Sequence, residues 1–504
     1  MPTAVQSKRR IEFGDFQTPL PLARRVCEVV REEMSDPASV VEPTCGRGSF
    51  LLAALEAFPS LKAAWGFDVN SEHLDAARSL LSRERNHDHW EVRQQDFFAA
   101  EWSAILADVP DPLLVIGNPP WVTNAAVGSL AGSNLPVKRN QHYKGLDALT
   151  GKSNFDISEW MLIRLLDELQ GRCAVLAMLC KTTVARKTLQ HAWKHDLISK
   201  AEIRPIDAAQ EFSASVDACL LICRLPGPPA HPEAKVFADL TDQRPTGRIG
   251  ICDDRIVSDL DAYERTRRLA GNGPFRWRSG IKHDCAKVME LERTGRRFRN
   301  GLGELVDLED AYLYPLLKSS DVARGGLSRS DRWMLVTQRS TGDDTREIAR
   351  HAPRTWEYLQ RHAERLDRRA SSIYRGRPRF AIFGVGPYSF APCKVAISCL
   401  YKRLSFCRID STQERPIVLD DTCAFLSFDT ADQADFASRL LGSEPAQEFY
   451  RSRIFWDAKR PVTVDVLRQL DLAKLARAIA PTNEFCDVWE RLTAARGNAQ
   501  MKLF

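Results

Sequence analysis

Residues 40–51 read VVEPTCGRGSFL, which is an apolar pair, a turn with two glycines and the start of an apolar run. The two valines are typical of a buried strand, and residues 50–57 have the apolar spacing of a helix. Gly46 and Gly48 would let the backbone approach a bound ligand, because glycine has no Cβ atom. The segment therefore predicts a strand, a glycine turn and a helix, which together form the unit of a ligand-binding α/β fold.

The remainder of the first 225 residues alternates between expected strands and helices. Apolar runs predict strands at 39–41, 64–69, 113–116, 174–179, 201–206 and 218–223. Helical spacing predicts helices at 19–33, 50–57, 71–82, 157–169 and 184–193, with Ser71 as an N-cap residue. Strands that are apolar on both faces indicate a sheet covered by helices on both sides. We therefore predict a doubly wound, Rossmann-like α/β domain with a mainly parallel sheet, whose ligands bind at the carboxyl ends of its strands.

A chain of 504 residues exceeds the usual size of one hydrophobic core, which predicts at least two domains. Residues 226–232 read PGPPAHP, and four prolines in seven residues cannot continue a helix or a central strand. We therefore predict a linker at 226–236 between a first domain at 1–225 and a second at 237–504.

The second part differs from the first in charge and in regularity. Residues 1–225 carry 25 basic and 28 acidic side chains, whereas residues 226–504 carry 46 and 38, so the basic excess lies wholly in the second part. This balance makes a polyanionic partner plausible for the second part. We predict an α+β domain there, with helices at 288–292, 346–370 and 431–441 and strands at 381–383, 394–400 and 424–428.

Composition excludes several classes of protein. With 44% hydrophobic and 27% charged residues, the chain is neither mainly disordered nor collagen-like. It has no run of about 18 apolar residues that would cross a membrane, and its start lacks the apolar core of a secretory signal. Its 13 cysteines are scattered without a CxxC pair, which favours free thiols over a zinc site or a disulfide framework. We expect a soluble, cytoplasmic protein without a metal site.

Two acidic residues follow the next predicted strands. Asp68 ends a strand 26 residues after Glu42, and an acid at this place accepts hydrogen bonds from ribose hydroxyls in nucleotide-binding folds. Asp96, followed by Phe97, would bind the edge and the ring of an adenine. The nicotinamide pattern GxGxxG is not met, because residue 51 is leucine, and the phosphate loop GxxxxGK[ST] is absent. The pattern predicts an adenosine ligand without a demanding phosphate, a description that S-adenosylmethionine fits.

Residues 113–121 read LLVIGNPPW, which is a buried strand that ends in a rigid turn. The two prolines fix φ and remove two N–H donors, so the turn exposes carbonyl groups. The Asn118 side chain and the Pro119 carbonyl would accept hydrogen bonds from an exocyclic amino group, and Trp121 would stack on the ring that carries it. Two such acceptors would stabilise the positive charge that develops on the nitrogen as it attacks a sulfonium methyl group. An ordinary proline turn is disfavoured because this one follows the glycine turn and both acids in order.

This ordered set resembles the N6-adenine DNA methyltransferases of bacterial restriction–modification systems in their γ arrangement. In that arrangement a cofactor-contacting motif precedes the glycine loop, and a target-recognition domain follows the catalytic domain. The resemblance identifies residues 16–19, FQTP, as the leading motif and Asn118, Pro119, Pro120 and Trp121 as the catalytic motif, although tyrosine is commoner than Trp121. The cofactor-binding residues that it implies are Thr18, Glu42, Cys45, Gly46, Gly48, Asp68, Asp96 and Phe97.

For two further positions the resemblance implies a functional role, and an ordinary structural role is the alternative. Phe212, in the segment EFSASVD, corresponds to the base-stacking aromatic residue of the family, with a core phenylalanine as the equal alternative. The segment of residues 153–156, SNFD, opens a helix where the family often contacts the cofactor. For Ser153 or Asp156 we favour a helix N-cap instead.

A base inside a duplex must be flipped out to reach such a pocket, so the second domain would bind the flanking DNA. Residues 276–299 contain eight Lys or Arg and three acids, and residues 346–379 contain ten Arg and four acids. We interpret residues 361–369 as a solvated helix face in which Glu364 and Asp367 pair with arginines. The loop RGRPR is the favoured DNA-binding element, through Arg375, Arg377 and Arg379.

We therefore predict a monomeric S-adenosylmethionine-dependent DNA adenine-N6 methyltransferase that acts on double-stranded DNA. We expect its cognate endonuclease to be a separate protein, because the (D/E)xK triplets at 233–235 and 457–459 are interpreted as chance and residues 282–284, KHD, as a surface turn. Cytosine N4 or an RNA base remains an alternative substrate. A catalytically silent DNA-binding defence subunit is the alternative from another class, and a glutamine methyltransferase ranks low.

Overall fold

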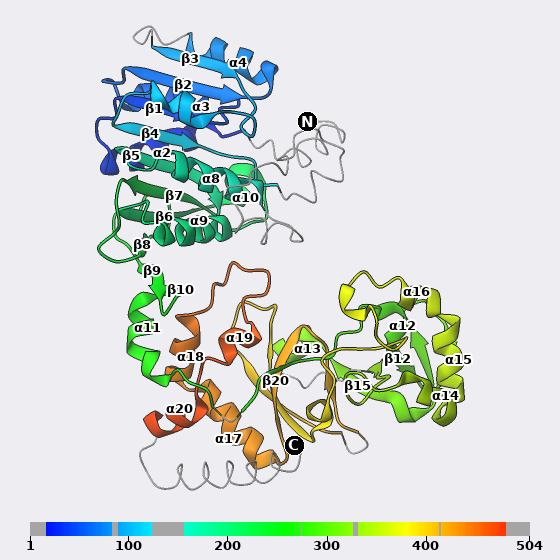
Figure 1. The fold of residues 1–504 in the computed structure, drawn as a ribbon. Helices are drawn as coiled ribbons and strands as arrows, with labels where there is room; N and C mark the ends of the chain where they lie inside the picture. Colours follow the sequence, from blue (N-terminus) through cyan, green and yellow to red (C-terminus); the bar gives the residue numbers. More distant parts are fainter. Residues whose placement is uncertain are drawn as a thin grey trace. The chain divides into compact units, whose positions relative to one another are not determined.

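The computed structural model describes residues 17–82, 89–122, 156–273, 275–325, 331–412 and 415–479. The chain divides into two compact units, Met1–Leu260 and Asp261–Phe504, whose elements are labelled in Figure 1. Phe16 of the predicted leading motif and Ser153 lie outside the described residues. Among the helices of the described residues, none has the length and apolar character needed to cross a membrane.

The first unit is built on one ten-stranded sheet. Its strands are β1 (Ser39–Glu42), β2 (Ala63–Asp68), β3 (Trp90–Gln94), β4 (Leu113–Gly117), β5 (Ala174–Lys181), β6 (Lys200–Ile206), β7 (Ala218–Leu225), β8 (Glu233–Val236), β9 (Gly247–Cys252) and β10 (Arg255–Val257). They lie in the order β10-β9-β8-β6-β7-β5-β4-β1-β2-β3. The strands from β3 to β5 pair in parallel, and β7 lies antiparallel between β5 and β6. The predicted doubly wound, mainly parallel sheet is confirmed.

Helices pack on both faces of this sheet. They are α2 (Leu20–Glu33), α3 (Ser49–Ala57), α4 (Ser71–Leu81), α5 (Trp102–Ala107), α8 (Ile157–Glu168), α9 (Thr182–Lys194) and α10 (Ala208–Phe212). The helices α2, α3 and α4 share one core with alternate strand residues such as Val40 and Leu114, whereas α8 packs against α5, α9 and β5. Every residue of β1 and β4 is buried, as expected for strands covered on both sides.

One predicted helix cap is wrong by one residue. Asn70, not Ser71, caps α4, since the Asn70 side chain accepts a hydrogen bond of 3.0 Å from the backbone N–H of Glu72. The backbone of Asn70 is extended, while Ser71 is already the first helical residue.

The predicted linker at 226–236 does not end the first unit. The prolines end β7, but the chain then returns to the sheet, where β8 pairs in parallel with β6 and β9 pairs with β8. The division between the units therefore falls after Leu260 rather than in the proline-rich segment. Proline lacks one backbone donor, and this loss does not prevent the residues that follow from pairing at a sheet edge.

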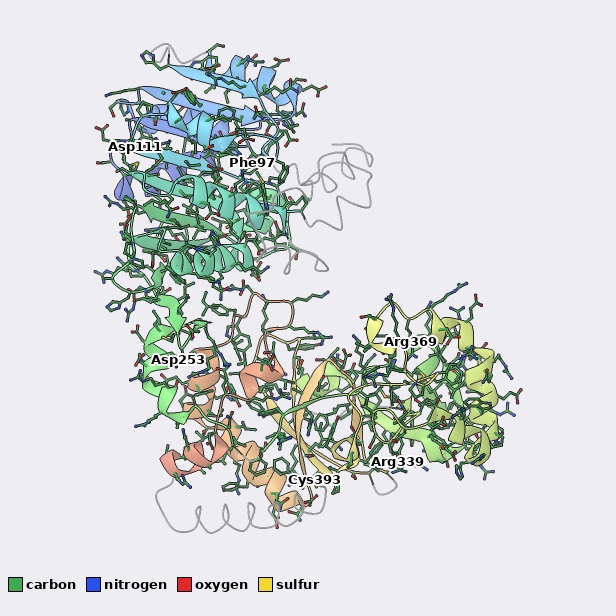
Figure 2. All side chains as sticks on the ribbon, viewed as in Figure 1. Phe97, Asp111, Asp253, Arg339, Arg369 and Cys393 are labelled. Carbon is green, nitrogen blue, oxygen red and sulfur yellow. The ribbon has the colours of Figure 1, made fainter. Side chains whose placement is uncertain are left out.

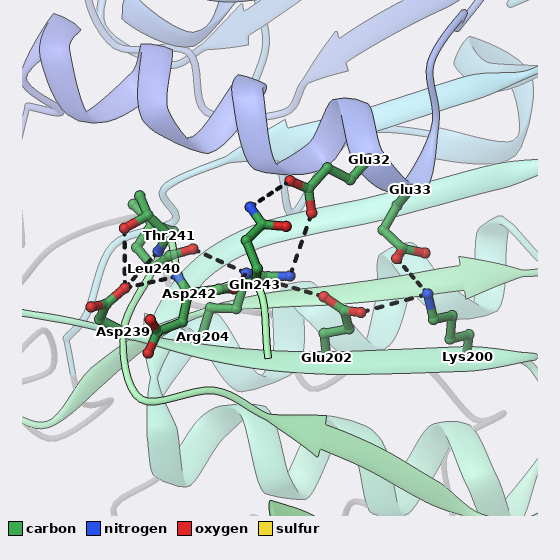
Figure 3. Close-up of polar contacts among 10 residues, drawn as sticks. All are labelled: Glu32, Glu33, Lys200, Glu202, Arg204, Asp239, Leu240, Thr241, Asp242 and Gln243. Atoms are coloured by element: carbon green, nitrogen blue, oxygen red, sulfur yellow. Dashed lines mark hydrogen bonds and ion pairs between the residues drawn. The ribbon is translucent and has the colours of Figure 1, made fainter. Parts of the chain in front are cut away.

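A buried arginine joins the segment after the prolines to β6 (Figure 3). Arg204 is 3% exposed, and its guanidinium donates to the carbonyls of Leu240 at 3.3 Å and Asp242 at 2.7 Å. The Arg204 side chain also pairs with Glu202 at 3.0 Å and lies over the Phe237 ring at 3.7 Å. Because these contacts satisfy a buried charge, they hold residues 237–242 in the first unit.

The second unit contains two sheets, in agreement with the predicted α+β class. The order β11-β20-β17-β18 forms an antiparallel sheet from β11 (Arg278–Ser279), β20 (Cys423–Phe428), β17 (Cys393–Ser398) and β18 (Phe406–Asp410). The order β14-β13-β12-β16-β15-β19 forms the other from β14 (Leu305–Val306), β13 (Arg297–Asn300), β12 (Glu290–Thr294), β16 (Arg332–Leu335), β15 (Leu313–Leu317) and β19 (Val418–Leu419). Helices α17 (Ala431–Gly442), α18 (Glu444–Arg451) and α20 (Leu472–Ile479) share a core with the four-stranded sheet.

Short helices complete the second unit. Three of them, α14 (Ile348–His351), α15 (Pro353–Arg361) and α16 (Ala363–Asp367), replace the single helix predicted at 346–370. Pro353 is the first residue of α15, where proline is tolerated, and it could not stand inside one long helix. The helix predicted at 288–292 is also wrong, because α12 (Ala286–Met289) ends where β12 begins. The other helices are α11 (Leu260–Thr266), α13 (Ser319–Ala323) and α19 (Val464–Leu467).

Candidate active site

The strand order reverses at β1. From β1 the chain continues to β2 on one side, and it later returns to β4 on the other side. In doubly wound sheets this reversal separates the loops that follow the two central strands, and ligands bind there. The loop after β1 carries the glycine turn, and the loop after β4 carries Asn118 to Trp121.

The glycine turn is fixed by its neighbours in the fold. Gly46 has φ +50° and donates its N–H to Asp68 Oδ2 at 2.9 Å, and Gly48 has φ +83° at the start of α3. A Cβ atom on Gly46 would lie 2.6 Å from Oε1 of Gln17, which accepts the N–H of Arg47 at 3.0 Å. The space beside Gly46, expected to receive a ligand, thus holds the side chain of Gln17 from the leading motif.

Asp68 lies where β2 ends, with its carboxylate oriented by the backbone. Its two oxygens accept the N–H groups of Gly46 at 2.9 Å and Asn70 at 2.8 Å. Each oxygen of a carboxylate has two lone pairs, so both retain acceptor capacity for ribose hydroxyls. The side chain of the next residue, Val69, is 51% exposed. Val69 was not among the site residues predicted from the sequence. An apolar residue directly after the terminal acid of a strand was the available signal.

Asp96 and Phe97 follow β3 with different surroundings. Asp96 Oδ1 accepts the backbone N–H of Phe98 at 2.9 Å, and its Oδ2 accepts no hydrogen bond from the described residues. The Phe97 ring is buried, with its centroid 4.9 Å from that of Trp102. The partly exposed ring at this turn is that of Phe98, which lies 5.2 Å from the Trp160 ring.

Two predicted cofactor residues are buried beneath the glycine turn. Glu42 Oε2 accepts the N–H of Leu51 in the first turn of α3 at 3.2 Å, and burial raises the pKa of the Glu42 carboxyl well above its usual range. Burial also raises the pKa of the Cys45 thiol, so this cysteine is neutral rather than a nucleophile. The Cys45 backbone N–H donates to the Phe67 carbonyl at 2.7 Å and so joins the turn to β2.

The predicted leading and catalytic motifs lie together. Asn118 Nδ2 donates to Thr18 Oγ1 at 3.3 Å, across 100 residues of sequence. Since Gln17 contacts the glycine turn, two consecutive residues join the loops that follow β1 and β4. The fold thus brings the predicted cofactor and catalytic residues of the first unit to one edge of the sheet.

Trp121 and Phe212 also lie together, at the end of the catalytic turn. Trp121 is 6% exposed, and its Nε1–H donates to the Leu179 carbonyl at 3.3 Å. Its ring centroid is 5.2 Å from that of Phe212, with an angle of 73° between the rings. One planar base can be parallel to only one of two rings at this angle. In this arrangement the two rings therefore cannot both lie face to face with the same base.

Lys181 is a further residue at this turn that the sequence reasoning missed. Its Nζ donates to the Trp121 carbonyl at 3.0 Å and to Asp156 Oδ2 at 2.6 Å. Asp156 caps α8 by accepting the N–H of Ser158 at 3.1 Å, so the N-cap interpretation is confirmed for it. A lysine at the end of an otherwise apolar strand was the signal for Lys181.

In the second unit, the predicted DNA-binding loop follows a short 3-10 turn. Arg375, Arg377 and Arg379 are all exposed, and Gly376 between them has φ +68°. Arg379 pairs with Asp367 at 2.6 Å, so its charge is neutralised within the chain. Arg375 and Arg377 have no carboxylate partner among the described residues.

Arg369, which is labelled in Figure 2, contacts residues on both sides of this loop. Its guanidinium lies 3.7 Å from the centroid of the Tyr374 ring and donates to the carbonyls of Ala381 at 2.7 Å and His283 at 3.2 Å. His283 itself is 7% exposed and lies 3.4 Å from Glu290. The interpretation of residues 282–284 as a surface turn is therefore wrong for His283, because Arg369 packs over it.

The two short helices before the loop, α15 and α16, have the paired charges predicted for a solvated face. Arg368 pairs with Glu364 at 2.5 Å, and Arg361 pairs with Glu357 at 3.2 Å. Each pair at this helical spacing stabilises the helix by about 0.5 kcal/mol at most. Because the two charges of a pair cancel, such pairs leave little net charge for a ligand.

Known proteins resemble both the sequence and the fold. The family model for N-6 DNA methylase matches residues 4–223. The type II methyltransferase M.NspV of Nostoc sp. (strain ATCC 29411 / PCC 7524) is 46% identical over 479 residues, which cover 94% of this chain and 98% of the relative.

Two solved structures belong to similar systems. One is the type IIL restriction–modification enzyme MmeI in complex with DNA, with a TM-score of 0.49 and 11% sequence identity. The similarity covers 92% of this chain and 65% of the MmeI chain. A methyltransferase subunit of a type I system from Streptococcus thermophilus has a TM-score of 0.33 and 15% identity over 44% of this chain and 47% of its own.

The first unit has a mainly parallel α/β sheet, and its NPPW turn lies beside the point where the strand order reverses. These features define a Rossmann-like methyltransferase unit. Because the similarity to the curated relative extends over nearly the whole of both chains, this chain belongs to the N-6 DNA methylase family of restriction–modification systems.

Proposed function

We propose that the protein transfers a methyl group from S-adenosylmethionine to the N6 atom of adenine in duplex DNA. The observation that carries this proposal is the contact of Asn118 with Thr18 beside the glycine turn, which unites a candidate amine site with a candidate cofactor site. We further propose that the protein acts as a monomer and is paired with a separate endonuclease.

The described residues fit this cofactor. Asp68 would accept the ribose hydroxyls, the exposed Val69 side chain would contact a face of the adenine, and Asp96 Oδ2 would accept from the adenine amino group. Gly46 and Gly48 shape the turn, Glu42 and Cys45 support it from the core, and the buried Phe97 ring packs against Trp102 next to Asp96 in the chain. When bound, S-adenosylmethionine supplies an electrophilic sulfonium methyl group.

The chain's own part in the chemistry is to hold the amine. Asn118 Oδ1 and the Pro119 carbonyl would accept the two N–H groups of the target amine, which favours a pyramidal nitrogen with an available lone pair. Pro120 keeps this turn rigid, because its ring fixes φ. These acceptors would also stabilise the positive charge that forms on the nitrogen during direct in-line transfer. The excess proton would then leave to solvent, and no covalent intermediate on the protein is needed.

The target base would leave the duplex and stack in the pocket. Trp121 has its indole N–H bonded to Leu179, and its ring is held edge to face with the Phe212 ring. We propose that the base stacks on one of these rings and meets the edge of the other. We favour Phe212 as the stacking ring, because it corresponds to the base-stacking aromatic residue of the family.

The second unit would hold the DNA that flanks the flipped base. Arg375 and Arg377 are the candidate contacts, since Arg379 is paired with Asp367. Replacement of Arg375 by alanine should weaken DNA binding and reduce its salt dependence. Binding that remains unchanged would remove this loop from the interface.

Transfer of tritium from labelled S-adenosylmethionine tests the function. The proposal expects label on plasmid DNA, and label only on RNA or on protein would overturn it. Single-molecule sequencing of DNA from expressing cells would then identify both the modified base and the site, and it would separate adenine N6 from cytosine N4. No transfer to any substrate by folded protein would favour the silent DNA-binding subunit.

A further inference from the structure

The hairpin of β12 and β13, with the edge strand β14 beside it, carries an arginine-rich surface. We name residues 290–300 the arginine ribbon. The turn of the ribbon contains Gly295 with φ +64°. Phe298 is 3% exposed and faces the core, so the alternation of the strand places Arg297 and Arg299 on the opposite, outward face.

The charge on this face is not neutralised. Arg299 is opposite Glu292 in β12 and opposite Leu305 in β14, which is 50% exposed. Across the part of the chain that the structure describes, no carboxylate lies within ion-pair distance of the side chains of Arg296, Arg297 or Arg299. Glu292, the cross-strand neighbour of Arg299, is also beyond ion-pair distance of these three side chains. Within the described ranges, the ribbon therefore presents three exposed guanidinium groups without a carboxylate partner.

Three arginines in the segment of α14, α15 and α16 are in a different state. They are paired with carboxylates at 3.4, 3.2 and 2.5 Å: Arg350 with Glu347, Arg361 with Glu357, and Arg368 with Glu364. A uniformly basic surface would not separate the two sets of arginines in this way. Arg296, Arg297 and Arg299 of the ribbon, like Arg375 and Arg377 of the loop, differ from these three in lacking a carboxylate partner among the described residues.

We propose that the arginine ribbon is a second DNA-binding site, which contacts the phosphates of the duplex backbone. This inference rests on the proposed function, and it adds a contact surface separate from the Arg375 loop. Guanidinium groups bind phosphate through two parallel hydrogen bonds, and the major groove admits a two-stranded ribbon. Side chains two residues apart on a strand stand about 6.7 Å apart, so Arg297 and Arg299 contact separate phosphates.

The test is the salt dependence of DNA binding by the full chain. The variant is Arg297→Gln with Arg299→Gln, and the matched control is Arg350→Gln with Arg361→Gln, which removes two arginines already paired. Binding to a 30-base-pair duplex is followed by fluorescence anisotropy between about 50 and 200 mM NaCl, the range over which phosphate contacts have a large effect. The slope of log K against log salt should fall by about 1.8 in the ribbon variant, or about 0.9 for each lost phosphate contact. The control should keep the slope of the unmodified protein.

Other outcomes of this binding experiment would overturn either the inference about the ribbon or the proposed function. A ribbon variant whose slope and affinity equal those of the control overturns the inference, provided that the unmodified protein binds and methylates DNA. Failure of the unmodified protein to bind any duplex overturns the proposed function itself. Loss of binding to an RNA duplex alone, with DNA binding intact, also overturns the assignment of the ribbon to DNA. Thermal unfolding of both variants shows whether these exposed substitutions leave the fold intact.

Discussion

Lys181 Nζ lies 3.0 Å from the carbonyl oxygen of Trp121 and so joins the end of β5 to the end of the catalytic turn. The same ammonium group pairs with Asp156, which caps α8, and the N–H of Ile157 donates to the Val122 carbonyl at 2.9 Å. Since the pair is nearly neutral overall, Lys181 can position the turn without placing a net positive charge beside an amine that becomes positive during methyl transfer.

Replacement of Lys181 by methionine should lower kcat with little change in the Kd for S-adenosylmethionine. The Trp121 carbonyl would lose its donor, and Asp156 would be left without its cation, which should destabilise the protein by about 2 kcal/mol. Lys187→Met is the control, because Lys187 pairs with Glu159 at 2.6 Å but is 55% exposed. Its stability should change by less than about 1 kcal/mol. An unchanged kcat in the Lys181 variant would contradict the positioning role.

Asn118→Ala should abolish methyl transfer while cofactor binding persists. Loss of one directed group at a developing charge commonly reduces the rate by about 100-fold or more. Asn118→Asp keeps an acceptor oxygen and should retain far more activity than the alanine variant. Single-turnover kinetics and calorimetric titration of S-adenosylmethionine measure the two properties separately. Near-normal turnover of Asn118→Ala would refute the acceptor role.

Phe212→Leu distinguishes a base-stacking ring from a core residue. Leucine keeps much of the apolar volume, so stability should fall by less than about 1.5 kcal/mol. It has no flat ring, and loss of stacking, about 1–3 kcal/mol per base, should reduce kcat/KM for DNA by at least about fivefold. Phe212→Trp should preserve activity better than leucine. Equal activity of Phe212→Leu and the unmodified protein would assign Phe212 to the core alone.

Glu42→Gln should change how stability depends on pH. Burial raises the pKa of Glu42 well above its usual value of 4.5, so the native state keeps a proton that the unfolded chain releases. Stability therefore falls as the pH rises from about 4.5 towards the native pKa. Glutamine still accepts the N–H of Leu51 but does not titrate. The stability of the variant relative to the unmodified protein should therefore increase between pH 5 and pH 8. Urea unfolding of both proteins at these two pH values measures the difference. A parallel pH dependence in both proteins would show that Glu42 does not titrate in this way.

Lys394→Met should stabilise the second unit more at neutral than at alkaline pH. Lys394 is 1% exposed in β17, and burial lowers its pKa from 10.5 to about 8. Between about pH 8 and pH 10.5 the unfolded chain keeps a proton that the native state has released. The destabilisation caused by the buried amine is therefore full below about pH 8 and disappears as the pH approaches 10.5. The advantage of methionine should be about 2 kcal/mol larger at pH 7.5 than at pH 10. The exposed Lys287→Met should show no such trend, and a pH-independent effect at Lys394 would contradict the prediction.

Local patterns accounted for much of the first unit. The helices at α2, α3, α8 and α9 and the strands β1, β2, β4 and β5 lie close to where apolar spacing placed them, because these elements are long or wholly buried. The chemistry at the strand ends was predictable for a related reason. Parallel strands bring their carboxyl ends to one edge, so the residues that follow several strands gather there whatever their separation in sequence.

Contacts between distant segments account for the errors. The prolines at 226–232 indicated a boundary, but Arg204 and the pairing of β8 with β6 keep the next segment in the first sheet. Gln17 occupies the space beside Gly46, which no spacing rule could indicate. Whether an arginine is paired, as Arg379 is, or unpaired, as Arg375 is, depends on which carboxylates the fold brings near it.

By itself, the sequence determined the class of the first unit and the kinds of group at its active edge, since glycine, acid and NPPW turns follow successive strands in order. Only the tertiary structure decided how these groups meet: Thr18 on Asn118, Lys181 on Trp121, and the Trp121 ring at 73° to the Phe212 ring. The physical reason is that strand periodicity is a property of neighbouring residues, whereas ring angles and ion pairs depend on packing between segments far apart in the chain.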